Sequence, residues 1–337
     1  MRISSLRNAP RVWGVALLLP AVACSGSDVT SPSKEVIRGT APMSGASASV
    51  APASLLGLTG RIAFERSPNG STYEIYKMNA NGTGVTRLTT NQAEDGVAAW
   101  SPDGKKIAFE STRAGNWEIW VMNSDGTAAT RLTNNSANDL QPAWSPDGKK
   151  IAFVSARGSR FNNGYAIYVM NMTGSGLTRL TIQCQSSLFS GCGESSPAWS
   201  PDGRRIVFAH KSGLHSTILE IMNADGSGVT PVPNTGPDVG APAWGSSGKI
   251  AFETSDGIFV IMPNGSGRTR LTHTLGWGDE HPSWSPDGTK IAFSSDRTFS
   301  SNPTGLVQIY AMNANGSSVT RLSKNSAVQD INPAWGP

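Results

Sequence analysis

The stretch Pro142-Ala-Trp-Ser-Pro-Asp-Gly-Lys-Lys-Ile-Ala-Phe153 decides the fold, because the chain repeats it. Variants of this stretch surround four other tryptophans, Trp100, Trp199, Trp244 and Trp284, and a shortened copy, Pro333-Ala-Trp-Gly-Pro337, ends the sequence. Within the stretch, proline presets one backbone angle and glycine accepts the positive φ that a tight hairpin needs. Each copy therefore predicts two short strands, A at the tryptophan and B at Ile-Ala-Phe, joined by a turn.

Two further phrases follow each Ile-Ala-Phe. One starts at Ile75, Ile119, Ile167, Leu219, Ile258 and Ile309, and the other, Thr-Arg-Leu-Thr or a variant, at Thr86, Thr130, Thr178, Thr230, Thr269 and Thr320. They predict strands C and D, joined in most copies by Asn-Gly or Asp-Gly, a strong hairpin signal. Pro231 and Pro233 fall in one D strand, which is tolerable only at an outer edge. Four-stranded units that recur every 40–55 residues or so predict propeller blades.

The copies of each strand also predict how the ring closes. Strands B, C and D occur six times from Arg61-Ile-Ala-Phe64 onward, whereas strand A occurs first at Trp100 and last at Trp335. The first blade thus lacks an A strand, and one A strand is left over at the end of the chain. We therefore expect an all-β, six-bladed propeller of four-stranded blades, closed by the C-terminal strand completing the first blade.

The N-terminal residues are typical of a targeting signal. Arg2, Arg7 and Arg11 precede an apolar run that ends at Ala23-Cys24, which predicts a signal peptide over residues 1–23. Ala21-Val-Ala-Cys24 resembles a bacterial lipobox, which implies cleavage before Cys24 and lipidation of its thiol; the alternative is ordinary cleavage after Ala23. Residues 24–59, rich in Ser, Ala, Pro and Gly, predict a flexible tether, and residues 60–337 form the predicted propeller.

The overall charge argues against a nucleic-acid partner. The chain has 28 basic and 24 acidic residues and a formal charge of +4. Removing the three arginines of the predicted signal peptide leaves 25 basic residues, so the mature chain is nearly neutral. This balance leaves no basic patch to attract a polyanion.

The repeated Trp-Ser-Pro-Asp-Gly-x-x-Ile-Ala-Phe phrase resembles the TolB-like propeller family, which is related to the WD-repeat propellers. The resemblance covers about residues 60–337. The family's namesake carries an α/β domain before its propeller, whereas we expect only the tether in that place. Similar propellers also precede a hydrolase domain in prolyl-oligopeptidase-like enzymes, but the sequence contains no Gly-x-Ser-x-Gly nucleophile elbow.

The loops on one face of the predicted propeller vary, and the same face carries a repeated acid. The B–C and D–A loops include the long segments 155–166 and 294–307, the tight segment 253–257 and the insertion 182–196. The acids that precede the A strands are Asp95, Asp139, Glu194, Asp238, Asp279 and Asp330. A ring of six carboxylates at the channel mouth suits a cation, such as Ca²⁺, or a basic ligand. Alternatively each acid ties its own blade, with Arg113, Arg157 and Arg297 as partners, and recurrence in every repeat favours this alternative.

Other residue types give weaker indications. The repeated tryptophans predict inter-blade core, while loop aromatics are better ligand candidates: Phe161, Phe189, Trp277 and Phe299. A metal site near Asp279 or Glu280 is conceivable for the four histidines, His210, His215, His273 and His281, although no recognised ligand spacing is present. Cys184 and Cys192 share one loop and predict a disulfide in an oxidising compartment.

These observations favour a non-catalytic binding module without a cofactor. We expect a monomeric propeller, lipid-anchored to the bacterial envelope, facing the periplasm or the cell surface from the outer membrane, that contacts a protein or an envelope ligand through the variable face. The alternative is a polysaccharide-active enzyme, because some related propellers are pectate-oligosaccharide lyases with a metal and histidine at the channel mouth. The fold alone does not separate the two.

Overall fold

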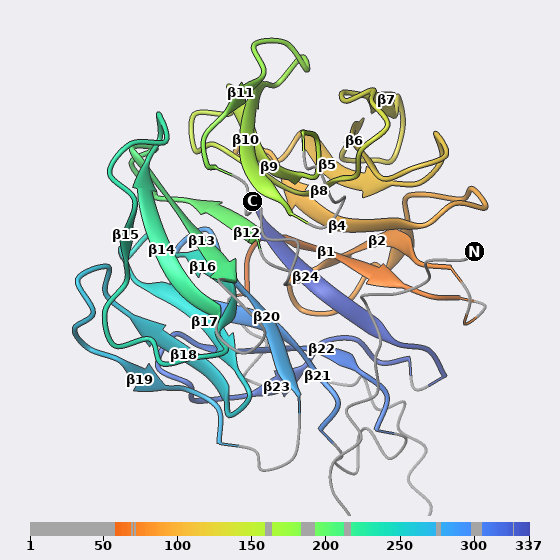
Figure 1. Ribbon diagram of the computed structural model, residues 1–337. Helices are drawn as coiled ribbons and strands as arrows, with labels where there is room; N and C mark the ends of the chain where they lie inside the picture. The colour runs from red at the N-terminus through yellow and green to blue at the C-terminus, as the bar shows by residue number, and fades with distance from the viewer. Residues whose placement is uncertain are drawn as a thin grey trace, which may run out of the picture. The chain divides into compact units, whose positions relative to one another are not determined.

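A computed structural model of the protein describes residues 58–68, 70, 72–158, 164–182, 193–211, 217–273, 278–297, 305–325 and 327–337. The regular structure within these ranges is entirely β, in six four-stranded antiparallel sheets that form the blades of a propeller (Figure 1). Among these residues there is no helix with the length and apolarity that a membrane crossing requires. The predicted fold class is confirmed.

Each blade is named in chain order, and its strands are given from A to D. Blade 1 consists of β24 (Asp330–Gly336), β1 (Arg61–Arg66), β2 (Glu74–Asn79) and β3 (Thr86–Arg87), and blade 2 of β4 (Asp95–Trp100), β5 (Lys106–Ser111), β6 (Glu118–Asn123) and β7 (Thr130–Arg131). Blade 3 consists of β8 (Asp139–Trp144), β9 (Lys150–Ser155), β10 (Ala166–Asn171) and β11 (Thr178–Arg179), and blade 4 of β12 (Gly193–Trp199), β13 (Arg205–Lys211), β14 (Thr217–Asn223) and β15 (Thr230–Pro231). Blade 5 consists of β16 (Gly240–Trp244), β17 (Ile250–Thr254), β18 (Gly257–Ile261) and β19 (Thr269–Arg270), and blade 6 of β20 (Asp279–Trp284), β21 (Lys290–Ser295), β22 (Gln308–Asn313) and β23 (Thr320–Arg321).

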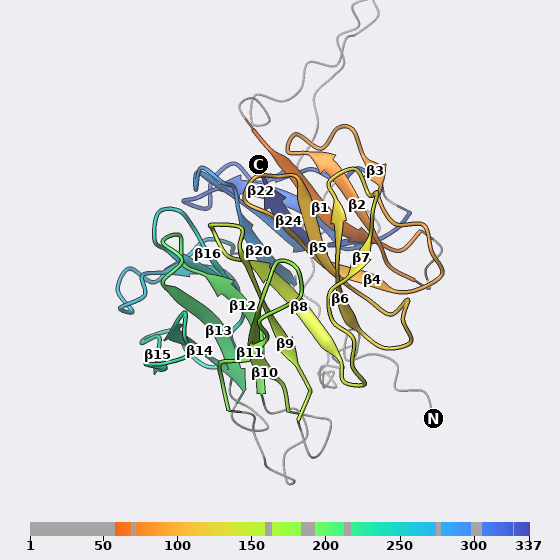
Figure 2. The ribbon, with the colours of Figure 1, turned by 90° about the horizontal axis from the view of Figure 1, so that it is seen from above.

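The C-terminal strand closes the ring as the repeat count predicted. Strand β24 pairs antiparallel with β1, so that Trp335 lies opposite Ile62 and Asp330 opposite Arg66. The indole Nε1 of Trp335 also donates a hydrogen bond to the carbonyl of Thr59 at 3.0 Å. Figures 1 and 2 show β1 and β24 side by side from two directions. Blade 1 is therefore built from both ends of the propeller.

The A strands are innermost, because those of successive blades contact one another around the centre. The B strands are buried on both faces: the Ile, Ala and Phe of Ile62–Phe64, for example, are fully buried. A blade covered on both sides by its neighbours needs a continuous apolar run rather than an alternating one. Five of the repeated tryptophans are only 7–9% exposed and pack between blades, as predicted; Trp244 is more exposed.

The two kinds of turn that share one face, here called the turn face, are stereotyped. In the A–B turn of blade 2, Oδ1 of Asp103 accepts hydrogen bonds from the Ser101 hydroxyl at 2.7 Å and the Lys105 N–H at 3.1 Å. In the C–D turns, a glycine with positive φ lies against the D segment of the preceding blade. A Cβ on Gly174 would come within 2.7 Å of the Leu132 carbonyl oxygen. The opposite face, which carries the B–C and D–A loops, is called the loop face.

The D strands are only two residues long, shorter than the Thr-Arg-Leu-Thr phrase suggested. Side chains extend their attachment to the blade. In blade 1, Arg87 donates to Oε1 of Glu74 at 2.7 Å and the Thr89 hydroxyl donates to its Oε2 at 2.6 Å. Pro231 is exposed in the outermost strand of blade 4, as its lack of an N–H requires.

Candidate functional site

Five of the six predicted acids lie at the loop-face end of an A strand and are buried. Their exposed fractions are at most 5%, and they are Asp95, Asp139, Glu194, Asp279 and Asp330. A buried carboxylate needs a partner or it loses its charge. The partners differ from blade to blade, and they determine what this face can do.

In four blades the partner is an arginine that is held from two sides. The guanidinium of Arg113 donates to both oxygens of Asp95 at 2.8 Å and lies 5.0 and 4.8 Å from the ring centroids of Phe109 and Trp120. A ring-stacked arginine likewise pairs with the aspartate in Asp139–Arg157, Asp279–Arg297 and Asp330–Arg66, through one carboxylate oxygen in the first two and both in the third. The arginines expected as partners are thus found there, and Arg66 of blade 1 joins them. Paired charge and cation–π contact together fix the end of each blade.

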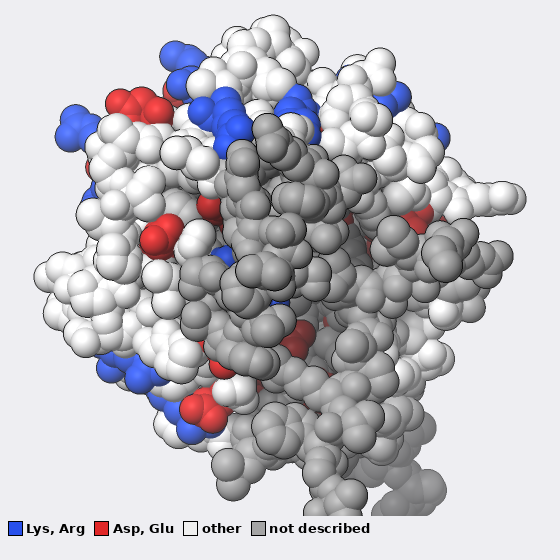
Figure 3. Space-filling model, in the orientation of Figure 1, with Lys and Arg blue, Asp and Glu red and all other residues white. Residues whose placement is uncertain are grey.

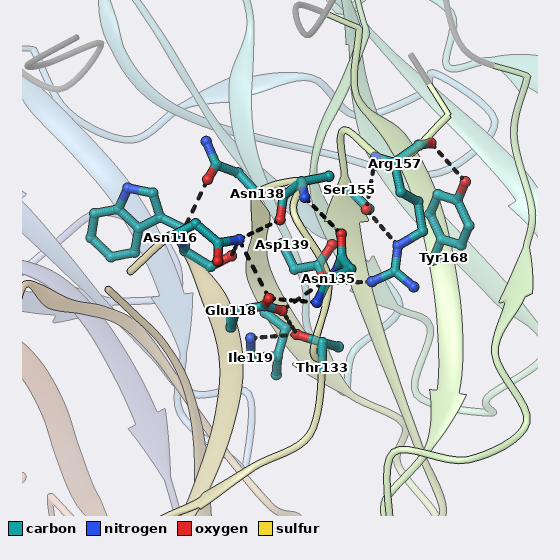
Figure 4. A network of polar contacts seen from close by, with 12 residues as sticks. Asn116, Glu118, Ile119, Thr133, Asn135, Asn138, Asp139, Ser155, Arg157 and Tyr168 are labelled. Carbon is teal, nitrogen blue, oxygen red and sulfur yellow. Dashed lines mark hydrogen bonds and ion pairs between the residues drawn. The ribbon is translucent and has the colours of Figure 1, made fainter. Parts of the chain in front are cut away.

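Blade 3 shows how far such a network extends (Figure 4). The Ser155 hydroxyl accepts a hydrogen bond from Nε of Arg157 at 2.8 Å, and the Asn135 amide donates to Asp139 at 2.8 Å. Asn135 also donates through its backbone N–H to Glu118 at 2.8 Å, which links strand A of blade 3 to strand C of blade 2. Burial raises the pKa of Asp139, against the lowering effect of Ser155 and Arg157. The carboxylate is therefore buried: its Oδ2 accepts hydrogen bonds from Asn135 and Arg157, while its Oδ1 has no hydrogen-bond partner among the described residues.

Blade 5 departs from the predicted ring. Asp238 lies one residue outside the common spacing, and the structure leaves it exposed, with φ of 55°, before β16 begins. The buried place of the acid is taken by Val239, which is 2% exposed and packs with Phe252. The inclusion of Asp238 in a ring of six equivalent acids is therefore wrong, because an apolar residue fills that position in this blade.

Blade 4 replaces arginine with histidine. Nδ1 of His210 lies 3.5 Å from Glu194 and 4.0 Å from Glu220. Glu220 occupies the position at which the paired aromatic stands in other blades, since it lies opposite Phe208 as Trp120 lies opposite Phe109. The nearby carboxylate of Glu194 raises the pKa of His210, and burial raises the pKa of Glu220. His210 belongs to strand β13 rather than to a loop, and its imidazole lies between two carboxylates.

A second set of recurring acids was missed from the sequence; Glu65 and Glu110 are buried and Glu253 is half-buried. Glu65, Glu110 and Glu253 follow Ile-Ala-Phe, and each accepts the N–H of a residue in the A strand of the next blade. The donors are Val97, Gln141 and His281, at 2.6, 2.8 and 2.7 Å. All three have positive φ, at a bulge in the A strand. The recurrence of Ile-Ala-Phe-Glu in the sequence could have identified these acids. Each glutamate connects its blade to the next one through a hydrogen bond.

The remaining candidates are not gathered into one site. His281 is half-buried on β20 in blade 6 and His273 is exposed, so neither is near His210 in blade 4 by position in the fold. Across the described ranges, no group of three or more His, Cys, Asp or Glu side chains is placed to hold a metal ion. The following candidates lie outside the described residues: Cys24, Cys184, Cys192, His215, Phe161, Phe189, Trp277 and Phe299. The disulfide and the loop-aromatic hypotheses stay predictions.

The charges visible on one face of the molecule are mixed. In Figure 3, the acidic side chains (red) and the basic side chains (blue) are mixed with one another on the described part of the surface. The visible surface has no single large patch of one sign. The charges on this face therefore give no support for recognition of a ligand by a large surface of one charge.

Comparison with known proteins places the chain in a family. The model of the TolB β-propeller domain matches residues 47–248. A TolB homologue of Chlorobium luteolum is 36% identical over 136 residues, which are 39% of this chain and 29% of the relative. A second TolB homologue, of Chlorobium chlorochromatii, is 42% identical over 106 residues, which are 30% of this chain and 23% of the relative. The chain thus aligns with less than a third of the length of either relative.

The crystal structure of TolB from Acinetobacter baumannii shares the fold. It superposes with a TM-score of 0.69 at 21% identity, covering 83% of this chain and 67% of that one. At that identity the superposition speaks for the propeller alone, whereas the matched domain model covers more than half of the chain. The repeated blades, the closure by the last strand and the matched residues agree, and the chain belongs to the TolB β-propeller domain family.

Proposed function

We propose that this protein is a non-catalytic, membrane-tethered propeller of the bacterial envelope that binds a protein partner through its loop face. One observation carries the proposal: the loop-face end of the blades differs from blade to blade, while the turns of the turn face are similar among the blades, apart from the shorter A–B turn of blade 5. Four blades present an Asp–Arg pair, blade 4 a Glu–His–Glu cluster and blade 5 an exposed Asp238. A rigid scaffold with one variable face is a common basis for recognition.

The buried acids support this proposal as parts of the scaffold. The four aspartates that pair with arginine are at most 2% exposed, so a ligand would have to displace arginine to reach them. We therefore propose that they tie the blades, and that a Ca²⁺ port at the channel mouth is the less favoured alternative. Protein binding is in turn favoured over lyase chemistry, because the histidines of the described blades do not converge on one point.

A crosslinking experiment tests the loop face. A photoreactive amino acid is placed at Ala114 or Asp256, which are exposed on the loop face, and at Asp125 or Lys149, which are exposed on the turn face. The full chain is expressed with its own signal sequence and irradiated in intact cells. We expect one discrete protein adduct from the loop-face positions and none from Asp125 or Lys149. Adducts confined to the turn-face positions, or none at all, would contradict the proposal.

The tether requires its own test, because it decides where the propeller is held. We propose that the signal peptide is removed before Cys24 and that the Cys24 thiol carries lipid. The mass of the mature N-terminal peptide should then show an acylated cysteine, and Cys24→Ser should release the protein from the membrane fraction. An unmodified Cys24 at the mature N-terminus would instead indicate ordinary export.

A further inference from the structure

Trp244 is the one repeated tryptophan whose side chain is not buried. Nε1 of Trp100, Trp199 and Trp284 donates to a carbonyl of the preceding blade at 3.1–3.2 Å. Nε1 of Trp244 donates instead to Gly248 in its own A–B turn, at 3.1 Å. Its ring is partly exposed, whereas those of the others are buried.

The A–B turn of blade 5 explains the difference. It reads Gly245-Ser-Ser-Gly-Lys249, which is one residue shorter than Ser101-Pro-Asp-Gly-Lys-Lys106 and has neither proline nor aspartate. Beside this shorter turn lies a groove of about 600 Å³ between blades 4 and 5, on the turn face. Its lining residues include Pro201, Arg205, Trp244, Ser247, Met262 and Pro263. This volume is in the range of sites that hold small ligands or a few side chains.

One cation in the groove, Arg205, has no hydrogen-bonded acceptor among the described residues, although it interacts electrostatically with Asp202. The guanidinium of Arg205 lies 5.0 Å from the ring centroid of Trp244, and it makes no hydrogen bond or ion pair with any residue that the structure describes. At the equivalent positions of blades 2 and 6, Nζ of Lys106 and of Lys290 donates to an asparagine of the same blade, at 3.3 and 2.6 Å. Arg205 is half-buried and lines the groove.

The surroundings of the groove are net positive. Arg204 and Lys249 are exposed in the two A–B turns that border it. Asp202 is the one acid in the lining. Its Oδ1 accepts hydrogen bonds from the Ser200 hydroxyl at 2.6 Å and the Arg204 N–H at 3.1 Å, and its charge also interacts with Arg205. Three cations against one committed carboxylate favour an anionic ligand.

We propose that this groove, lined by Arg205, Trp244, Met262 and Pro263, binds a partner polypeptide through an acidic side chain next to an apolar one. The carboxylate pairs with Arg205, and the apolar side chain lies against Trp244 and Met262. Trp, Arg and Met are the residues enriched at the energetic centres of protein interfaces. The inference rests on the proposed protein-binding function and adds a second contact, on the opposite face from the loops.

A peptide titration tests the chemistry of the groove. The mature chain, with tryptophan indoles labelled with ¹⁵N, is titrated with Ac-Gly-Glu-Leu-Gly-NH₂, and the Trp244 signal is assigned from Trp244→Phe. We expect a saturable shift of that signal and roughly tenfold weaker binding of the Ac-Gly-Gln-Leu-Gly-NH₂ control, because a charged acceptor strengthens the bond to a guanidinium. Arg205→Gln should remove this preference, whereas Lys150→Gln, at the equivalent position of blade 3, should keep it.

Each alternative outcome bears on the proposal. Equal binding of the two peptides, or no shift of Trp244, overturns it without requiring any variant to fold. A shift of Trp244 with glucuronate or N-acetylglucosamine but not with the peptides assigns the groove to a sugar and overturns it as well. If the loop-face crosslinks form but the peptides do not bind as expected, the proposed function stands and the groove proposal fails. If the peptides bind as expected but no loop-face crosslink forms, only the proposed function is contradicted.

Discussion

The arginines of blades 1, 2, 3 and 6 do two things that a lysine would not do equally well. The flat guanidinium covers two aromatic rings and still donates in its plane to an aspartate, as Arg157 does over Phe153 and Tyr168, with ring distances of 5.4 and 5.2 Å. A compact ammonium lacks this geometry. Removing the aspartate from such a site leaves a half-buried cation without its counter-charge.

Asp139→Ala should therefore lower the stability of the protein by about 1–3 kcal/mol, with or without ligand, because buried donors lose their acceptor. Thermal melts of the wild type and the variant, each with and without millimolar calcium, measure this. Lys149→Ala, an exposed change on the turn face, is the control. A variant that melts no lower than the wild type, together with a calcium-dependent rise in the wild type alone, would support the cation port instead.

His210 should make the stability of the protein fall as pH rises. Its pKa is raised in the folded state above 6.5, its ordinary value, by Glu194 and Glu220. Its contribution is complete below the unfolded pKa and is lost as pH rises through the folded pKa. The melting temperature should thus drop across and above neutral pH, and less so in His210→Gln.

The exposed His273 provides the matched control for this measurement. His273→Gln should keep the wild-type pH profile, because no carboxylate pairs with it among the described residues. If His210→Gln and the wild type had parallel profiles, the imidazole between Glu194 and Glu220 would not be the titrating group.

At the level of the element, the C–D turns act as spacers between blades. Gly174 has φ of +84° and lies against the Leu132 backbone, so an added Cβ has no room to move away. Gly115 has φ of +103° but nothing within 4 Å of its would-be Cβ. Both positions require a residue that tolerates positive φ, but only at Gly174 would an added Cβ also collide with the neighbouring blade.

Gly174→Ala should accordingly destabilise the protein by more than Gly115→Ala, which costs only about 1 kcal/mol of backbone strain. Denaturant unfolding gives the free energy of unfolding of each variant. The difference between the two losses measures how much the close approach of Gly174 to the neighbouring blade matters for stability. Equal losses in the two variants would show that blade spacing is not set at this turn.

The sequence was informative about elements that repeat and poor about those that depend on a neighbouring blade. Ile-Ala-Phe and Ser-Pro-Asp-Gly predicted the B strands and the A–B turns because their pattern is local. The bulge at Val97, with φ of 40°, has no local signal, since valine disfavours that angle and the stabilising acceptor is Glu65 of blade 1. The Glu194–His210–Glu220 cluster was likewise hidden, because its members come from three strands.

For the whole molecule, closure by β24 makes the ends of the propeller interdependent. Deleting residues 330–337 should expose the inner edge of β1 and cause cooperative loss of the fold, because blade 1 loses its A strand and blades 2 and 6 lose a packing surface. Thermal or denaturant unfolding followed by circular dichroism measures it, with removal of Pro337 alone as the control. An unchanged melting temperature after the larger deletion would rule out the closed ring.

The same pairing has a consequence for the order of events during synthesis. Arg61 emerges from the ribosome long before Gly336, its partner across the strand pair. Five blades can assemble from neighbouring sequence, but β1 must wait with an unpaired edge until β24 is free. Contacts between such distant residues form slowly, and an open edge recruits other chains in the meantime. The newborn chain is therefore most exposed to aggregation in the interval before β24 is released, and a chaperone that covers β1 would act at that stage.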